Sequence, residues 1–228
     1  MEMQALGLTL RLAGVTTVLL LAGAVPLAWW IARGRGLGRA VVQAVVALPL
    51  VLPPTVVGFY LLVGLGPLTG VGRLIAKGLG HPLAFSFAGL LVGSMIFSLP
   101  FAVQPMVAGF QGIERGYLDA AAGLGWPPRS VFLGVGLPMA RASLLTSAVL
   151  AFTHTVGEFG VVLMLGGNIP GVTRTLSISL YDLVQDGNYA AANRTALVLV
   201  GFAMAALLVI YLLPGMRKMD GRQANVVR

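Results

Sequence analysis

The sequence has 228 residues, of which 57% are hydrophobic and only 10% charged, whereas soluble domains carry about 25% charged residues. A soluble fold of this size could not bury so much apolar surface, so we expect lipid to cover part of the chain. The net charge of +8 does not indicate nucleic-acid binding, because the basic residues lie in short clusters between apolar runs. The absence of cysteine excludes disulfides, and two histidines without cysteine argue against a zinc site.

Five apolar stretches reach the length of about 18 residues that a membrane-spanning helix requires. They cover residues 12–32, 40–65, 83–107, 142–165 and 195–213. Prolines at positions 49, 53 and 54 predict a kink or local unwinding in the second stretch. Between the stretches, residues 66–82 are Gly-rich and predict a loop, and residues 108–141 and 166–193 are more polar. The sequence therefore predicts one all-α domain over residues 1–228, a polytopic membrane helical bundle with about five transmembrane helices.

The distribution of Lys and Arg predicts the orientation of the bundle, because cytoplasmic segments carry an excess of both. With the N-terminus outside, ten basic residues face the cytoplasm: Arg33, Arg35, Arg39, Arg115, Arg129, Arg141, Arg217, Lys218, Arg222 and Arg228. Five face outward: Arg11, Arg73, Lys77, Arg174 and Arg194. We therefore expect the N-terminus outside and the C-terminus in the cytoplasm.

A short helix is predicted over residues 119–124, in the polar segment before the fourth stretch. Asp119 favours the first helical turn and three alanines continue the helix. Gly125 suits a left-handed terminating position, and the two prolines that follow prevent continuation. The alanines form a slim surface that could lie in a cleft of another protein. The simpler interpretation is a capped connector between two spans.

The same segment carries a spaced pattern: Asp-Ala-Ala, three residues, Gly, nine residues, then Val-x-Leu-Pro. This pattern resembles the permease signature of binding-protein-dependent ABC importers. The matching residues are Ala120, Ala121, Gly125, Leu137 and Pro138. Asp119 and Val135 stand where the signature usually has Glu and Ile. The resemblance implies a coupling-helix region at about residues 109–138, with the helix itself at about 117–125, that docks into a groove on an ATP-hydrolysing subunit.

Two further segments, residues 47–63 and 156–187, resemble the molybdate and sulfate permeases. The second contains Gly-Glu-Phe-Gly, Gly-Asn-Ile-Pro-Gly and Thr-Arg-Thr, which are similar to the molybdate type. The resemblance implies a type I ABC importer permease in a bacterial or archaeal cytoplasmic membrane. It also implies two copies around one pore, two ATP-binding subunits and an extracytoplasmic oxyanion-binding protein.

The chain has no phosphate-binding loop of the form GxxxxGK[ST]. We therefore expect that it is not an enzyme by itself and binds no cofactor, and that ATP and Mg²⁺ belong to the partner subunits. Closely related alternatives are tungstate or sulfate as the transported anion. Alternatives of another class are an ATP-independent carrier or channel, and a membrane enzyme that uses His154 and Glu158 as an acid–base pair.

Glu158 is the most unusual residue inside an apolar stretch, because a carboxylate in the membrane usually faces the bundle interior or a cavity. His154 lies four residues earlier, so a continuous helix would place both on one face. They could face the pore or a second copy, or they could form a structural hydrogen bond between helices. Further candidates for the translocation path or gate are Thr153, Gly157, Asn168 and Arg174, the last of which could equally be a solvated loop charge.

Overall fold

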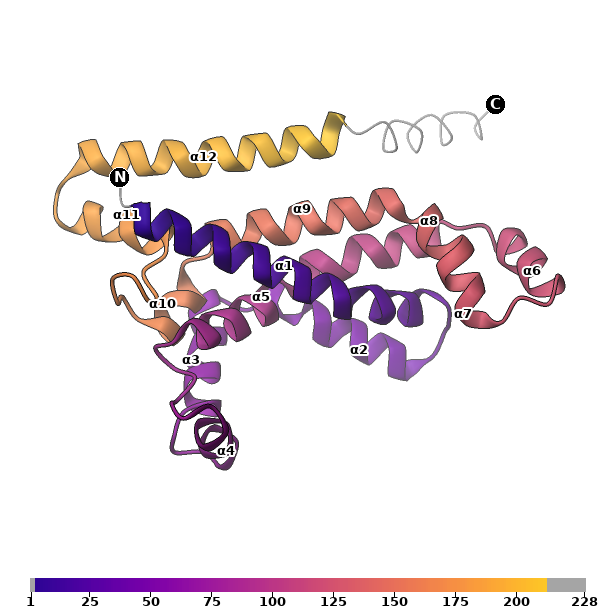
Figure 1. The fold of residues 1–228 in the computed structure, drawn as a ribbon, viewed down its shortest axis with the longest axis horizontal. Coiled ribbons are helices and arrows are strands. Elements are labelled where there is room, and N and C mark those ends of the chain that lie inside the picture. The colour runs from indigo at the N-terminus through magenta and orange to yellow at the C-terminus, as the bar shows by residue number, and fades with distance from the viewer. Residues whose placement is uncertain (1–2, 213–228) are drawn as a thin grey trace.

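The structure is a computed structural model that describes residues 3–212, and within this range it is helical without strands. The basic residues predicted to face the cytoplasm at the C-terminal end, Arg217, Lys218, Arg222 and Arg228, lie outside this range, as does residue 213 of the fifth predicted span. Figure 1 shows long helices that run side by side along one axis, with shorter helices at both ends. The long helices are α1 (Met3–Ala32), α5 (Phe87–Gln111), α9 (Arg141–Gly157) and α12 (Tyr189–Leu212).

The shorter elements fall into three groups along the chain. After α1 come α2 (Leu37–Ala47), a 3-10 turn (Leu48–Leu50), α3 (Pro54–Gly64) and α4 (Gly70–Leu79). Between α5 and α9 lie α6 (Arg115–Gly123), α7 (Pro128–Val131), a π-helical turn (Phe132–Gly136) and α8 (Leu137–Met139). After α9 come α10 (Gly160–Gly166) and α11 (Leu176–Gln185).

Within residues 3–212, three helices, α1, α5 and α12, are long and apolar enough to cross a membrane alone. Two bent pairs raise the number to as many as five. One pair joins residues Leu37–Leu50 to Pro54–Gly64 at 110°, and the other joins Pro128–Met139 to Arg141–Gly157 at 70°. The helical bundle and the break at the prolines near residue 53 are thus confirmed.

Two of the predicted elements were wrong. Residues 66–82 are not simply a loop, because the Thr69 hydroxyl caps α4 by accepting the Gly72 N–H at 2.9 Å. The polar segment 166–193, for which no element was predicted, contains α11, which Thr175 caps in the same way through the Ile178 N–H. The predicted continuous helix over 142–165 ends at Gly157 and resumes at Gly160.

The main core lies where α1, α5 and α9 meet and pack their apolar side chains against one another. Phe110 and Met106 of α5 are almost fully buried there, and Trp29 of α1 meets the Phe110 ring edge-on with centroids 5.2 Å apart. Trp29 is therefore half-buried in this core. At the opposite end, the Thr9 hydroxyl of α1 accepts the Leu176 N–H of α11 at 2.8 Å.

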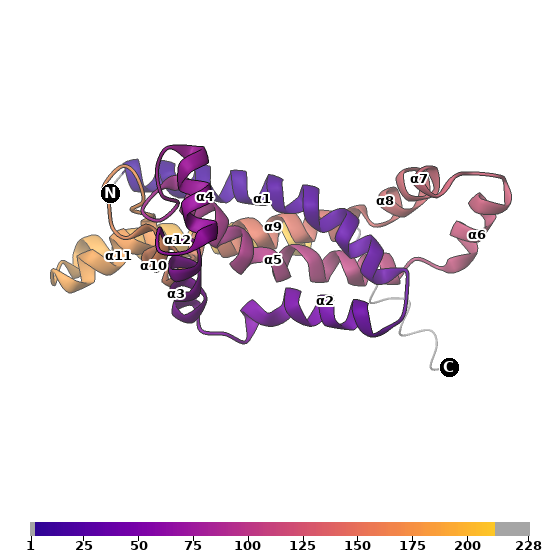
Figure 2. The same cartoon turned by 90° about the horizontal axis from the view of Figure 1, so that it is seen from below.

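The bundle has two structurally different ends (Figures 1 and 2). The α6 end holds α6, α7 and α8 together with the C-terminal part of α1. The α10 end holds α3, α4, α10 and α11 together with the start of α1. Each end contains one group of the residues that the sequence singled out.

Candidate functional site

Helix α6 projects from the bundle at the α6 end (Figure 1). It spans Arg115–Gly123. It therefore begins four residues before the helix predicted at 119–124 and two residues before the coupling helix that the resemblance implied at about 117–125. Gly125 has φ of +83°, so the predicted left-handed position is present. Its N–H donates to the Ala122 carbonyl at 2.9 Å and the Trp126 N–H donates to the Ala121 carbonyl at 3.2 Å. These two hydrogen bonds form a Schellman motif, which fixes the direction in which the chain leaves the helix.

One face of α6 is anchored and the other is free. Leu118 and Ala121 are buried against the bundle, whereas Ala120 and Ala122 are exposed. Leu124, the residue that follows the helix, is 80% exposed although it is apolar. The surface available to a partner therefore includes two of the three alanines rather than all three.

The segment that carries the second half of the signature packs against the main core and against the residues that follow α6. Leu137 packs against the main core, whereas Pro138 is exposed. Two glycines of this segment make room for tryptophan rings. A Cβ added at Gly134 would lie 2.6 Å from the Trp126 ring, and one added at Gly136 would lie 2.6 Å from the Trp29 ring. Sequence reasoning missed these contacts because they depend on how the folded chain places the two rings.

At the α10 end, four of the predicted residues line one cavity of about 480 Å³, which we name the Glu158 cavity. Its lining residues are Pro54, Thr55, Phe97, Thr153, His154, Gly157, Glu158, Phe159 and Gly160. The cavity exists because α9 ends at Gly157 and Glu158 is extended, with ψ of 133°. The expectation that His154 and Glu158 share a helical face was therefore wrong, although both face the same cavity.

The Glu158 side chain is only 5% exposed and lacks a hydrogen bond of good geometry at either carboxylate oxygen. The buried Ser94 hydroxyl interacts with it but also falls short of that geometry. The first turn of α3 contributes Pro54 and Thr55 to the cavity, so the positive end of a helix dipole faces it. A buried and incompletely satisfied carboxylate is unfavourable for folding, which makes a functional role the better explanation.

His154 is held differently. Its Nδ1 lies 2.9 Å from the Ser98 hydroxyl of α5, which lies 2.9 Å from the Thr155 hydroxyl. Its ring stacks on Phe101 with centroids 4.0 Å apart. These contacts join α9 to α5, as the structural interpretation expected. Thr153 donates its hydroxyl to the Val149 carbonyl at 2.7 Å, within its own helix.

Asn168 and Arg174 lie together, but they do not line the Glu158 cavity. The Asn168 amide donates to both carboxylate oxygens of Asp182 at 2.9 and 2.8 Å. Arg174 Nε donates to the Asn168 carbonyl oxygen at 2.6 Å and lies 3.6 Å from Asp182. Asp182 on α11 was not among the predicted residues. The cluster ties the segment after α10 to α11, so Arg174 is more than a solvated loop charge.

The chain shows clear similarity to curated proteins and solved structures. Residues 24–218 match the family described as binding-protein-dependent transport system inner membrane component. A relative from Azotobacter vinelandii, the molybdenum transport system permease protein ModB, is 49% identical over 92% of this chain and 93% of its own length. The protein of the same name from Escherichia coli K12 is 33% identical over 91% of both chains.

A solved bacterial ABC transporter that imports the acidic polysaccharide alginate superposes with a TM-score of 0.70 at 19% identity. The match covers 92% of this chain and 79% of that one, and it supports the fold alone. A second structure of an alginate transporter, in complex with its substrate-bound periplasmic protein, gives a TM-score of 0.69. The resemblance found in the motifs is thereby confirmed, and the chain belongs to the family of binding-protein-dependent transport system inner membrane components.

Proposed function

We propose that this chain is the membrane-spanning permease subunit of an ATP-driven molybdate importer. The observation that carries the proposal is the 49% identity to a molybdenum transport permease over nearly the full length of both chains. The geometry agrees with it, since a free helix at one end and a cavity at the other suit a subunit that converts a partner's motion into pore opening.

The proposed assembly contains two copies of this chain, two ATP-binding subunits and an extracytoplasmic oxyanion-binding protein. ATP and Mg²⁺ belong to the ATP-binding subunits, which receive α6 in a groove. Asp119, Ala120 and Gly125 belong to this coupling surface, whereas Ala121 and Leu137 hold it to the bundle. Pro138 belongs to the coupling-helix region.

The N-terminus is proposed to lie outside and the C-terminus in the cytoplasm. Helix α1 begins at the α10 end and finishes at the α6 end, where the basic residues between α1 and α2 also lie (Figure 1). The excess of Lys and Arg in the predicted cytoplasmic segments supports the same direction. The α6 end then faces the ATP-binding subunits and the α10 end faces the binding protein.

The proposed mechanism is alternating access. Closure of the ATP-binding subunits moves the two α6 helices together, and the bundle opens at the α10 end to accept the anion. Thr153, His154, Gly157 and Glu158 lie on the translocation path or its gate, because the break after Gly157 is a place where α9 and α10 can change their relative direction. Asn168 and Arg174 keep the outer segment in position through Asp182.

ATP hydrolysis by the reconstituted complex in lipid vesicles tests this function. The binding protein is supplied empty or loaded with molybdate, tungstate or sulfate. The proposal expects the molybdate-loaded form to stimulate hydrolysis most. Stimulation by tungstate or sulfate alone would reassign the anion within the same class. A chain that forms no complex with the ATP-binding subunit, and transports molybdate without ATP, would contradict the proposal in favour of an ATP-independent carrier.

A further inference from the structure

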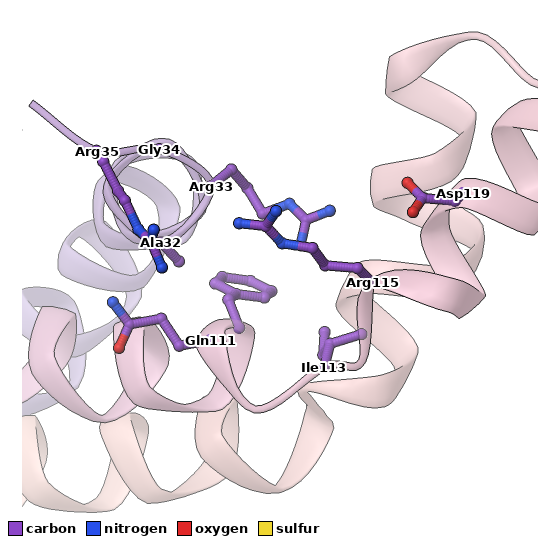
Figure 3. Close-up of a pocket in the computed structure, with 9 residues that line it drawn as sticks. Ala32, Arg33, Gly34, Arg35, Gln111, Ile113, Arg115 and Asp119 are labelled. Atoms are coloured by element: carbon purple, nitrogen blue, oxygen red, sulfur yellow. The ribbon is translucent and has the colours of Figure 1, made fainter.

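A second concave site lies at the α6 end, between the last residues of α1 and the start of α6. Its volume is about 570 Å³. We name it the arginine pocket, and its lining residues are Ala32, Arg33, Gly34, Arg35, Phe110, Gln111, Ile113, Arg115 and Asp119. Figure 3 shows the side chains of Arg33, from the end of α1, and Arg115, from the start of α6, extending toward the pocket that both line. Nothing in the permease signature accounts for this arrangement.

The charges of the pocket are not balanced by the chain around it. Three arginines line it and Asp119 is the single carboxylate among the lining residues. None of the three arginines is within ion-pair distance of a carboxylate in residues 3–212. The Arg33 guanidinium instead lies over the Trp29 ring, 4.8 Å from its centroid. Because like charges repel, converging guanidinium groups are stable when an anion lies between them.

The side-chain types indicate which anion fits. A guanidinium group presents a planar pair of N–H donors, and this pair matches two oxygens of a phosphate or a similar tetrahedral oxyanion. Arg115 is the first residue of α6, so the positive end of that helix adds to the field. Phe110 and Ile113 form an apolar floor that leaves the donors as the main polar contacts.

We propose that the arginine pocket binds a tetrahedral oxyanion group, carried by a free ion or by the phosphate of an anionic lipid headgroup. The bound group bridges Arg33 at the end of α1 to Arg115 at the start of α6. An occupied pocket therefore holds α6 in one position relative to the bundle. The site lies at the opposite end from the Glu158 cavity and does not depend on molybdate being the transported substrate.

Binding measurements on the full chain test the proposal. The purified chain is placed in nanodiscs of phosphatidylcholine and titrated with inorganic phosphate and with molybdate. In parallel, retention of phosphatidylglycerol is measured by native mass spectrometry of chain extracted from mixed vesicles. The variants are Arg115→Gln and the double variant with Arg33→Gln. Both residues are exposed, so the fold should survive. The matched control is Arg73→Gln, an exposed arginine on α4 at the other end.

We expect Arg115→Gln to weaken binding about tenfold and the double variant to weaken it further, because each variant removes charge-assisted hydrogen bonds to the anion. Arg73→Gln should behave like the original chain. Loss of phosphate or molybdate binding identifies a free ion, and loss of phosphatidylglycerol retention alone identifies a lipid headgroup.

The proposal is overturned if the original chain retains none of these probes, or if the double variant retains all of them equally. These readouts need neither ATP nor the binding protein. They therefore succeed or fail independently of the proposed transport function.

Discussion

The two ends of the bundle achieve their geometry by different means. At the α6 end, a short helix is fixed by its own cap, and its partner-facing surface remains exposed. At the α10 end, two short helices and an extended residue enclose a carboxylate that has no good hydrogen bond. One end therefore resembles a prebuilt docking element, whereas the other holds a buried carboxyl group without a good partner, and we expect that end to change during a cycle. The following tests ask whether stability and function separate at each end in the way this contrast implies.

The largest effect is expected at Glu158. The change Glu158→Gln replaces an ionisable carboxyl group by a neutral amide of the same size, and removing a buried charge without a partner should stabilise the folded chain by about 1–3 kcal/mol. We expect the melting temperature to rise while substrate-stimulated ATP hydrolysis falls by about tenfold or more, because residues that serve function often lower the stability of the fold. Thermal unfolding of the chain and hydrolysis by the complex measure the two quantities. A stabilised variant with full activity would make Glu158 a dispensable residue of the fold.

The next test uses two glycines with the same backbone conformation at opposite ends. Gly125 after α6 and Gly187 after α11 have φ of +83° and +71°, and both are in Schellman motifs with no atom within 4 Å of an added Cβ. A left-handed alanine should destabilise each turn by about 1–2 kcal/mol. Only Gly125→Ala should lower ATP hydrolysis by the complex, by several-fold.

Gly187→Ala is the matched control, because it introduces the same strain away from α6. Affinity for the ATP-binding subunit, measured by titration in detergent, provides a second readout. If both variants lose affinity equally, the effect reflects general destabilisation, and the special role of the α6 end is wrong.

A smaller effect is expected where α5 and α9 are joined. Ser98→Ala removes the hydroxyl between His154 and Thr155, and the loss of such hydrogen bonds should destabilise the chain by about 1 kcal/mol. Chemical denaturation of the purified chain measures this difference. Because Phe101 still stacks on His154, we expect little change in transport. A large loss of transport with unchanged stability would place Ser98 on the translocation path instead.

The smallest effect is expected in the cluster near α11. Asp182→Asn removes the charge that Arg174 faces at 3.6 Å, and a partly exposed pair of this kind contributes less than about 1 kcal/mol. We expect a small change in melting temperature that decreases further in high salt. A loss of stability well above that size would mean that this cluster, rather than the packing of α10 on α3, holds the α10 end together.

These contrasts also explain what could be predicted from the sequence. The end of α6 was predictable because Gly125 and the prolines after it act locally. The break after Gly157 was not, since residues 156–165 are apolar apart from Glu158 and compatible with a continuous helix. The chain after the break packs closely on the start of α3. A Cβ on Gly160 would lie only 2.7 Å from Pro54 Cβ, so this approach requires glycine. Asp182 was missed for the same reason, since its partner Asn168 is fourteen residues away.

The most direct test of the account is cross-linking from α6 to the ATP-binding subunit. The chain has no cysteine, so a single introduced thiol reports one position. We compare Ala122→Cys, on the exposed face of α6, with Ala121→Cys, on its buried face. A reagent that carries a maleimide for the introduced thiol and a photoreactive group for the partner should join the first variant to the ATP-binding subunit and leave the second unjoined. If the complex forms but neither variant, or only Ala121→Cys, is joined to that subunit, α6 is not the coupling helix and the central claim fails.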